Sequence, residues 1–114
     1  MGLKKGDIVL ANFPFDTLKR SKKRPALIIW AREDNMTFTL IMITSKELNV
    51  SRKGEFIIPT NHPEFQQTGL LVSSKVRAYR MVTLHRSLII GKLGFLGKRL
   101  LRELDEKIME AFNL

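Results

Sequence analysis

Residues 19–29 read KRSKKRPALII and place five cations within six positions, directly before a proline and an apolar run. Because these charges repel one another and prefer water, we expect an exposed loop over residues 14–24. Pro25 to Trp30 is almost continuously apolar and too short for a helix, which predicts a strand buried on both faces. Pro25 also restricts the backbone beside Arg24. The last cation of the loop is therefore expected to be held where the loop meets a sheet.

Shorter apolar segments on both sides of this stretch predict further strands. Gly6 and Pro14 bound one of them, and Pro59 ends another. Polar segments with turn residues separate the strands at intervals of roughly ten residues, which is typical of an all-β barrel or sandwich. The additional strands are expected at residues 7–13, 37–44, 55–58, 75–79 and 87–91.

The C-terminal segment has the periodicity of a helix. Large apolar residues recur every four positions, and charged residues occupy the opposite face. These apolar residues are Leu96, Leu100, Leu104, Ile108 and Phe112. Such a stripe usually packs into a core, so we expect a helix of about four turns on the sheet. The 114 residues then form a single mainly β domain over residues 1–114, a small β-barrel with a C-terminal α-helix packed on it.

The composition indicates a polyanionic partner. The formal net charge is +9 and the pI is about 10.3. This favours nucleic acid, although ribosome association or an anionic membrane surface would have the same signature. The absence of cysteine excludes disulfides and zinc–thiolate sites. No segment reaches the 18 or so apolar residues of a membrane span, so we expect a soluble cytoplasmic protein without membrane partners.

Arg24, Thr44 and Ser45 are the candidates for chemistry on RNA. Metal-free RNA cleavage must deprotonate the ribose 2′-OH, stabilise the phosphorane and protonate the leaving 5′-oxygen. A fixed arginine suits the second task, because its fork donates two hydrogen bonds to phosphate and keeps its charge. A hydroxyl at a strand end, as at Thr44 and Ser45, can brace a phosphate oxygen. Equally, these residues can be read as a solvated loop cation and ordinary turn residues.

Two further groups of residues are candidates for binding the RNA strand. The basic loop supplies Lys19, Arg20, Lys22 and Lys23. Lys75, Arg77 and Tyr79 alternate with small apolar residues, so they are predicted to share one face of a half-exposed strand. Tyrosine stacks on bases while cations follow the backbone. A charged edge strand that merely resists aggregation has the same pattern.

The remaining polar and aromatic residues point to no other chemistry. His62 and His85 have no triad-like partner in sequence and are expected in turns or on the surface. Trp30 and Phe38 are expected in the core. The chain has no Gly-rich phosphate loop, carboxylate pair or metal-ligand spacing, so neither a metal nor a cofactor is expected.

An ordered series of short motifs resembles the PemK/MazF toxins of type II toxin-antitoxin modules. It begins with GDIV at residues 6–9 and FPF at 13–15, followed by KRPALII at 23–29. The later matches are Ile43–Ser45, Gly69–Leu70, Ser74–Val76, Thr83 and Ile90–Leu93 before the terminal helix. The resemblance therefore extends over essentially the whole chain.

This resemblance implies an SH3-like barrel, a homodimer and a metal-independent endoribonuclease. Such enzymes cut single-stranded RNA and leave a 2′,3′-cyclic phosphate and a 5′-OH. The resemblance also implies a cognate antitoxin whose acidic tail occupies the RNA groove, and DNA binding together with that antitoxin. By correspondence of motifs, Arg24 would stabilise the phosphorane and is a candidate donor of the leaving-group proton, and Thr44 would fix the scissile phosphate with Ser45 nearby.

The chain departs from one branch of this family. That branch has a catalytic Arg and Asp at the places of Val72 and Ser74, and a His in the first loop. Its acid–base scheme therefore does not transfer, and the general base is left open, with Asp16 as a weak candidate. Two alternatives stay open: a non-catalytic toxin like those that inhibit gyrase, and a plain RNA-binding β-barrel.

Overall fold

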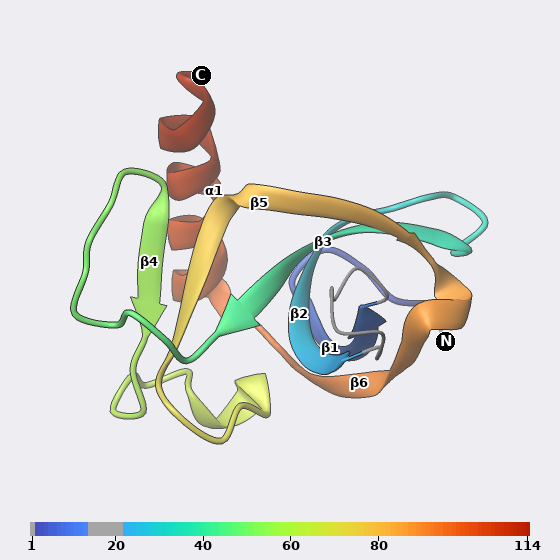
Figure 1. Ribbon diagram of the computed structural model, residues 1–114, viewed down its shortest axis with the longest axis horizontal. Coiled ribbons are helices and arrows are strands. Elements are labelled where there is room, and N and C mark those ends of the chain that lie inside the picture. Colours follow the sequence, from blue (N-terminus) through green and yellow to red (C-terminus); the bar gives the residue numbers. More distant parts are fainter. Residues whose placement is uncertain (1, 14–21) are drawn as a thin grey trace.

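The computed structural model describes residues 2–13 and 22–114. Six strands, two short 3-10 helices and one α-helix follow one another along this part of the chain (Figure 1). The strands are β1 (Asp7–Phe13), β2 (Lys22–Ala31), β3 (Thr37–Thr44), β4 (Glu55–Ile58), β5 (Ser74–His85) and β6 (Ile89–Phe95). The helices are η1 (Gln66–Thr68), η2 (Arg86–Leu88) and α1 (Lys98–Phe112).

The strands form one antiparallel sheet in the order β4-β5-β3-β2-β1-β6. Figure 1 shows this sheet curling strongly, with α1 standing beside β4 and the first half of β5. The predicted mainly β class and the C-terminal helix are confirmed. The hydrogen-bonded ladder of the described strands begins at β4 and ends at β6, and the SH3-like barrel stays a prediction.

Three strands extend beyond their predicted limits because ladder pairing depends on the neighbouring backbone more than on local side-chain pattern. The first, β2, begins at Lys22, which pairs with Phe13 of β1, so Arg24 lies within a strand and not at the end of a loop. The long β5 pairs with β4 and the end of β3 through its first half, and with the start of β3 through its second half. The last, β6, lies at residues 89–95 and not at 87–91.

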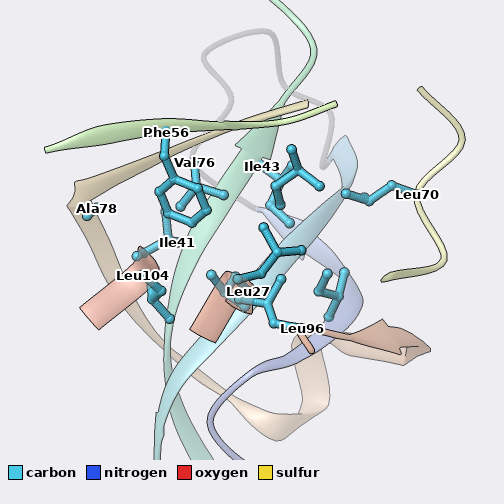
Figure 2. Packing of buried hydrophobic residues seen from close by; sticks show 12 residues of the cluster. Leu27, Ile41, Ile43, Phe56, Leu70, Val76, Ala78, Leu96 and Leu104 are labelled. Carbon is cyan, nitrogen blue, oxygen red and sulfur yellow. The ribbon is translucent and has the colours of Figure 1, made fainter. Parts of the chain in front are cut away.

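Alternating side chains divide the core into two clusters on opposite faces of the sheet. The cluster under α1 is drawn in Figure 2 and includes Leu27, Ile41 and Val76, together with Leu100 and Leu104 of the helix. The other cluster fills the concave side of the curl and consists of Val9, Ala11, Phe13, Ala26, Ile28, Phe38, Leu40 and Leu84. Burial of Phe38 is confirmed, but the prediction for Trp30 is wrong, since its side chain is 49% exposed.

Distant carboxylates attach α1 to the loops that flank the sheet. Glu64 accepts hydrogen bonds from the backbone N–H groups of Arg99 (3.0 Å) and Leu100 (2.9 Å) in the first turn of the helix. Near the other end, Glu110 accepts the N–H of Gly54 at 2.7 Å. Among the described residues, no helix is long and apolar enough to cross a membrane.

Candidate active site

The structure brings Arg24 and Thr44 to the same place. The ladder between β2 and β3 pairs Ala26 with Met42, and continuing this register by two residues sets Arg24 opposite Thr44. Both side chains are half-buried, and both line the same two cavities, of about 500 Å³ and 410 Å³. The two residues therefore stand at a shared boundary between the cavities.

The larger cavity, called the groove below, is lined by cationic and apolar side chains together with Thr44. Its cations are Arg24, Lys46, Arg77 and Arg80. Its apolar residues are Phe13, Met42, Met81 and Val82. Guanidinium and ammonium groups bind phosphate, and a flat apolar surface accepts the face of a base. This lining suits a single strand of nucleic acid.

The smaller cavity is mainly apolar. Leu10, Pro25 and Ile43 contribute from the sheet, and Leu93 contributes from β6. The segment that follows η1 supplies the remaining apolar side chains, and Ser45 and Ser74 add hydroxyl groups at its border. Such a cavity accepts an uncharged, flat group more readily than a phosphate.

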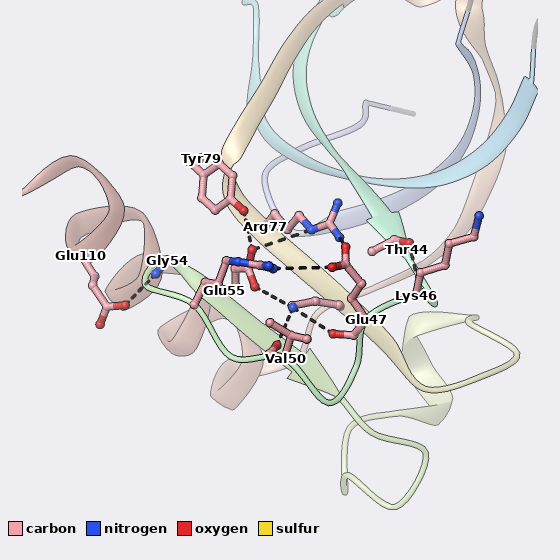
Figure 3. Close-up of polar contacts among 11 residues, drawn as sticks. Thr44, Lys46, Glu47, Val50, Gly54, Glu55, Arg77, Tyr79 and Glu110 are labelled. Atoms are coloured by element: carbon pink, nitrogen blue, oxygen red, sulfur yellow. Dashed lines mark hydrogen bonds and ion pairs between the residues drawn. The ribbon is translucent and has the colours of Figure 1, made fainter. Parts of the chain in front are cut away.

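Thr44 has a defined hydrogen-bond role. The backbone N–H of Lys46 donates to Thr44 Oγ1 at 3.1 Å (Figure 3). A hydroxyl that accepts this bond keeps its own hydrogen for another acceptor. Thr44 can therefore donate to a phosphate oxygen in the groove.

The face of β5 that was predicted to bind RNA is more buried than expected. Lys75 is fully buried, and its Nζ lies 2.6 Å from Glu55 Oε1. The predicted half-exposed face is therefore wrong at Lys75, because β4 and the loop before it cover this end of β5. The Arg77 side chain is 13% exposed and lines the groove, whereas Tyr79 is 39% exposed.

A buried carboxylate organises these three side chains. Glu55 accepts a short hydrogen bond from the Tyr79 hydroxyl and lies 3.8 Å from Arg77 Nε. Burial raises the pKa of Glu55, but the hydrogen bonds from Lys75 and Tyr79 lower it more, so the net pKa is below the usual value. The same bond to Glu55, followed by burial, raises the pKa of Tyr79.

The basic loop lies largely outside the described residues. Lys19 and Arg20 fall there, as does Asp16. Lys22 begins β2, and Lys23 is exposed in the same strand, paired with Asn12 of β1. Their proposed contact with RNA stays a prediction.

The structure also locates Ser45 and the two histidines. Ser45 is exposed and lines the apolar cavity beside Thr44. As expected, His62 lies in a loop, and His85 is exposed at the end of β5. Their Nδ1 atoms accept the backbone N–H groups of Glu64 and Ser87. Within residues 2–13 and 22–114, no three His, Asp or Glu side chains are placed to hold a metal ion.

Sequence reasoning missed Lys46 and Arg80 as groove residues. Lys46 follows Thr44 by two positions, so its place at the strand end was a usable signal. Arg80 gave no such signal, because a lone cation in a strand can face either side of a sheet. Val72 and Ser74 both line the apolar cavity.

Comparison with known proteins places the chain in a family. The model of PemK-like, MazF-like toxins of type II toxin-antitoxin systems matches residues 4–112. No curated protein sequence matches. Among solved structures, Mycobacterium tuberculosis toxin MazF-mt6 is 23% identical, with a TM-score of 0.72 over 95% of this chain and 97% of that chain.

Two other solved structures have the same fold. MazF from Deinococcus radiodurans is 21% identical, with a TM-score of 0.73 over 100% of this chain and 99% of that one. A mycobacterial endoribonuclease in complex with its cognate antitoxin is 13% identical, with a TM-score of 0.73 over 99% and 97% of the two chains. Since the family match spans nearly the whole sequence, the chain belongs to the PemK-like, MazF-like toxins of type II toxin-antitoxin systems.

Proposed function

We propose that this toxin is a metal-independent endoribonuclease that cuts single-stranded RNA into fragments with 2′,3′-cyclic phosphate and 5′-OH ends. The observation that carries the proposal is the position of Arg24 and Thr44 at the boundary of one cationic groove and one apolar cavity. The phosphate chain would follow the cations of the groove, and a base beside the cut would enter the apolar cavity.

The reaction is an intramolecular transesterification, in which the ribose 2′-oxygen displaces the 5′-oxygen at phosphorus. The ribose 2′-oxygen loses its proton and forms a bond to phosphorus, and the bond from phosphorus to the 5′-oxygen breaks as that oxygen gains a proton. Arg24 would stabilise the extra negative charge of the phosphorane with two parallel hydrogen bonds. Thr44 would donate its hydroxyl hydrogen to a non-bridging oxygen and so hold the scissile phosphate.

We also propose the partners that go with this activity. A solved mycobacterial relative was crystallised with its cognate antitoxin, and MazF from D. radiodurans with MazE. The cationic groove would equally accept an acidic antitoxin segment, since both ligands are polyanions. The working unit would be a homodimer, and its barrel would be SH3-like.

Cleavage of an unstructured oligonucleotide in EDTA tests the enzyme proposal. We expect cutting without divalent metal, fragments with cyclic phosphate ends, and complete resistance of a substrate whose ribose at the cut site lacks the 2′-OH. Activity that requires added metal, or that cuts the 2′-deoxy substrate, would contradict this mechanism.

Binding of RNA without cleavage is the second candidate function. The described residues that line the groove are cationic, hydroxyl-bearing or apolar, and such a lining is sufficient for binding alone. Tight binding of the intact oligonucleotide, with no fragments after long incubation, would favour this function.

A further inference from the structure

The ammonium group of Lys75 makes three polar contacts inside the protein. Besides its ion pair with Glu55, its Nζ donates to the carbonyl oxygens of Glu47 (3.0 Å) and Val50 (2.6 Å). The buried ammonium group is therefore held by two backbone carbonyls and one carboxylate. Replacing a buried ion pair with apolar residues often leaves stability unchanged or improves it. Both hydrogen bonds go to the backbone of one loop, residues 45–54.

That loop begins at Thr44. Thr44 is the ladder partner of Lys75 at the end of the pairing between β3 and β5. At the start of the loop, the backbone N–H of Lys46 donates a hydrogen bond to Thr44 Oγ1. Directly after it, Glu47 adopts a left-handed backbone conformation with φ of 55°. A non-glycine residue keeps this conformation only when its surroundings hold it. The Glu47 carbonyl accepts hydrogen bonds from Lys75 Nζ and from the Val50 N–H, so Lys75 is one of the groups in contact with this strained residue.

The same loop residue also reaches the groove. The Glu47 carboxylate lies 2.6 Å from Arg77 Nη2, and Figure 3 shows Glu47 between Arg77 and the strand end at Thr44. Arg77 lines the groove together with Thr44. A change in the conformation of Glu47 would therefore affect two groove residues, Arg77 and Thr44.

We infer that Lys75 is a positioning residue for Thr44. By fixing the backbone of residues 46–50, Lys75 holds the Lys46 N–H against Thr44 Oγ1, so that the hydroxyl hydrogen of Thr44 points to the scissile phosphate. Lys75 itself does not touch RNA. The effect of Lys75 on cleavage rests on the proposed ribonuclease activity. Its role in fixing the backbone of residues 46–50 does not.

The test uses the variant K75M/E55L, which removes both buried charges together. A single Lys75 replacement would leave the carboxylate of Glu55 buried and unpaired, whereas the double replacement is expected to fold. We expect kcat for oligonucleotide cleavage to fall at least about tenfold, because one aligned donor is lost. A change in KM would report the release of Arg77 from Glu55. The control Ile58→Val, a mild core change in the neighbouring strand β4, should leave kcat unchanged.

A double-mutant cycle shows whether the effect passes through Thr44. In a Thr44→Val background, K75M/E55L should cause no further loss of kcat, because the hydroxyl that Lys75 positions is already absent. Equal losses in both backgrounds, or a wild-type kcat in K75M/E55L, would overturn the inference.

Hydrogen exchange gives a readout that needs no activity. The Lys46 amide should exchange at least about tenfold faster in K75M/E55L than in the wild type, while amides of β1 keep their protection. Unchanged Lys46 exchange would overturn the inference by itself. A wild-type protein that does not cut RNA would instead overturn the proposed function, and the exchange measurement would still decide the role of Lys75 in the loop.

Discussion

The proposed chemistry depends on two side chains that enter from neighbouring strands. Arg24 is held in β2 next to Pro25, and Thr44 is held at the end of β3 by the N–H of Lys46. A guanidinium group contributes most when its orientation is set before the substrate binds, because no energy is then needed to reorganise it. The rigid sheet supplies that orientation for both residues.

Replacing Arg24 tests its proposed role in stabilising the phosphorane. Arg24→Ala should lower kcat by a factor of about 10² or more, the effect of removing one transition-state donor. Arg24→Lys should be intermediate, because it keeps the charge but loses the planar fork. Single-turnover cleavage rates measure both effects, with thermal unfolding as the check on folding. A wild-type rate in Arg24→Ala would move the active site elsewhere.

The helix α1 covers one face of the sheet. Its buried stripe covers the apolar cluster that includes Leu27 and Ile41. The helix starts at Lys98. In its first turn, the backbone N–H groups of Arg99 and Leu100 donate to the carboxylate of Glu64, a residue of the loop after β4. A carboxylate is favoured at this position because the N-terminus of a helix carries partial positive charge.

Glu64 makes the stability of the helix dependent on pH. Burial raises the pKa of Glu64, but the hydrogen bonds from Arg99 and Leu100 lower it more, so the net pKa lies below the usual value. A lowered pKa in the folded state stabilises the protein above the unfolded pKa, and this contribution is lost as the pH falls through the folded pKa.

Glu64→Gln is therefore expected to destabilise the protein at neutral pH by about 0.5–1 kcal/mol. The difference from wild type should shrink as the pH falls below the unfolded pKa of about 4.3 and through the lower folded pKa, because the wild-type carboxylate becomes protonated over that interval. Urea unfolding at several pH values measures it. Glu106→Gln is the control, because Glu106 is exposed on the same helix. A difference that stays constant down to pH 2.5 would contradict the capping role.

The net charge of +9 acts at the scale of the whole molecule. Four of the cations line the groove beside Thr44, whereas others, such as Lys98 on α1, lie outside it. Cations that contact phosphates release counterions when RNA binds, so only those in the binding path change the salt dependence of affinity. The location of a cation therefore matters more than the total charge.

Lys46→Ala and Arg80→Ala should each weaken RNA binding and reduce the slope of log K against log salt by about 0.7. Lys98→Ala should leave the slope unchanged. Fluorescence anisotropy with a labelled oligonucleotide at several salt concentrations measures all three. Equal slopes for the three variants would mean that RNA does not follow the groove.

Local sequence patterns were sufficient for several elements. The predicted limits of β1, β3 and β4 agree with the structure, and Leu100 and Leu104 are fully buried as the four-residue spacing predicted. Alternation and helical periodicity are properties of neighbouring residues, so they can be read without knowing what packs against the element. The motif that contains Arg24 was also sufficient to single out that residue.

The tertiary structure alone decided what surrounds each strand. Lys75 has the sequence context of an exposed cation, yet β4 and the loop after Thr44 bury it against Glu55. Arg80 lines the groove, and Trp30 is exposed despite its apolar neighbours. A strand shows two faces whatever its sequence, and the face that becomes core depends on register and on segments far away in the chain.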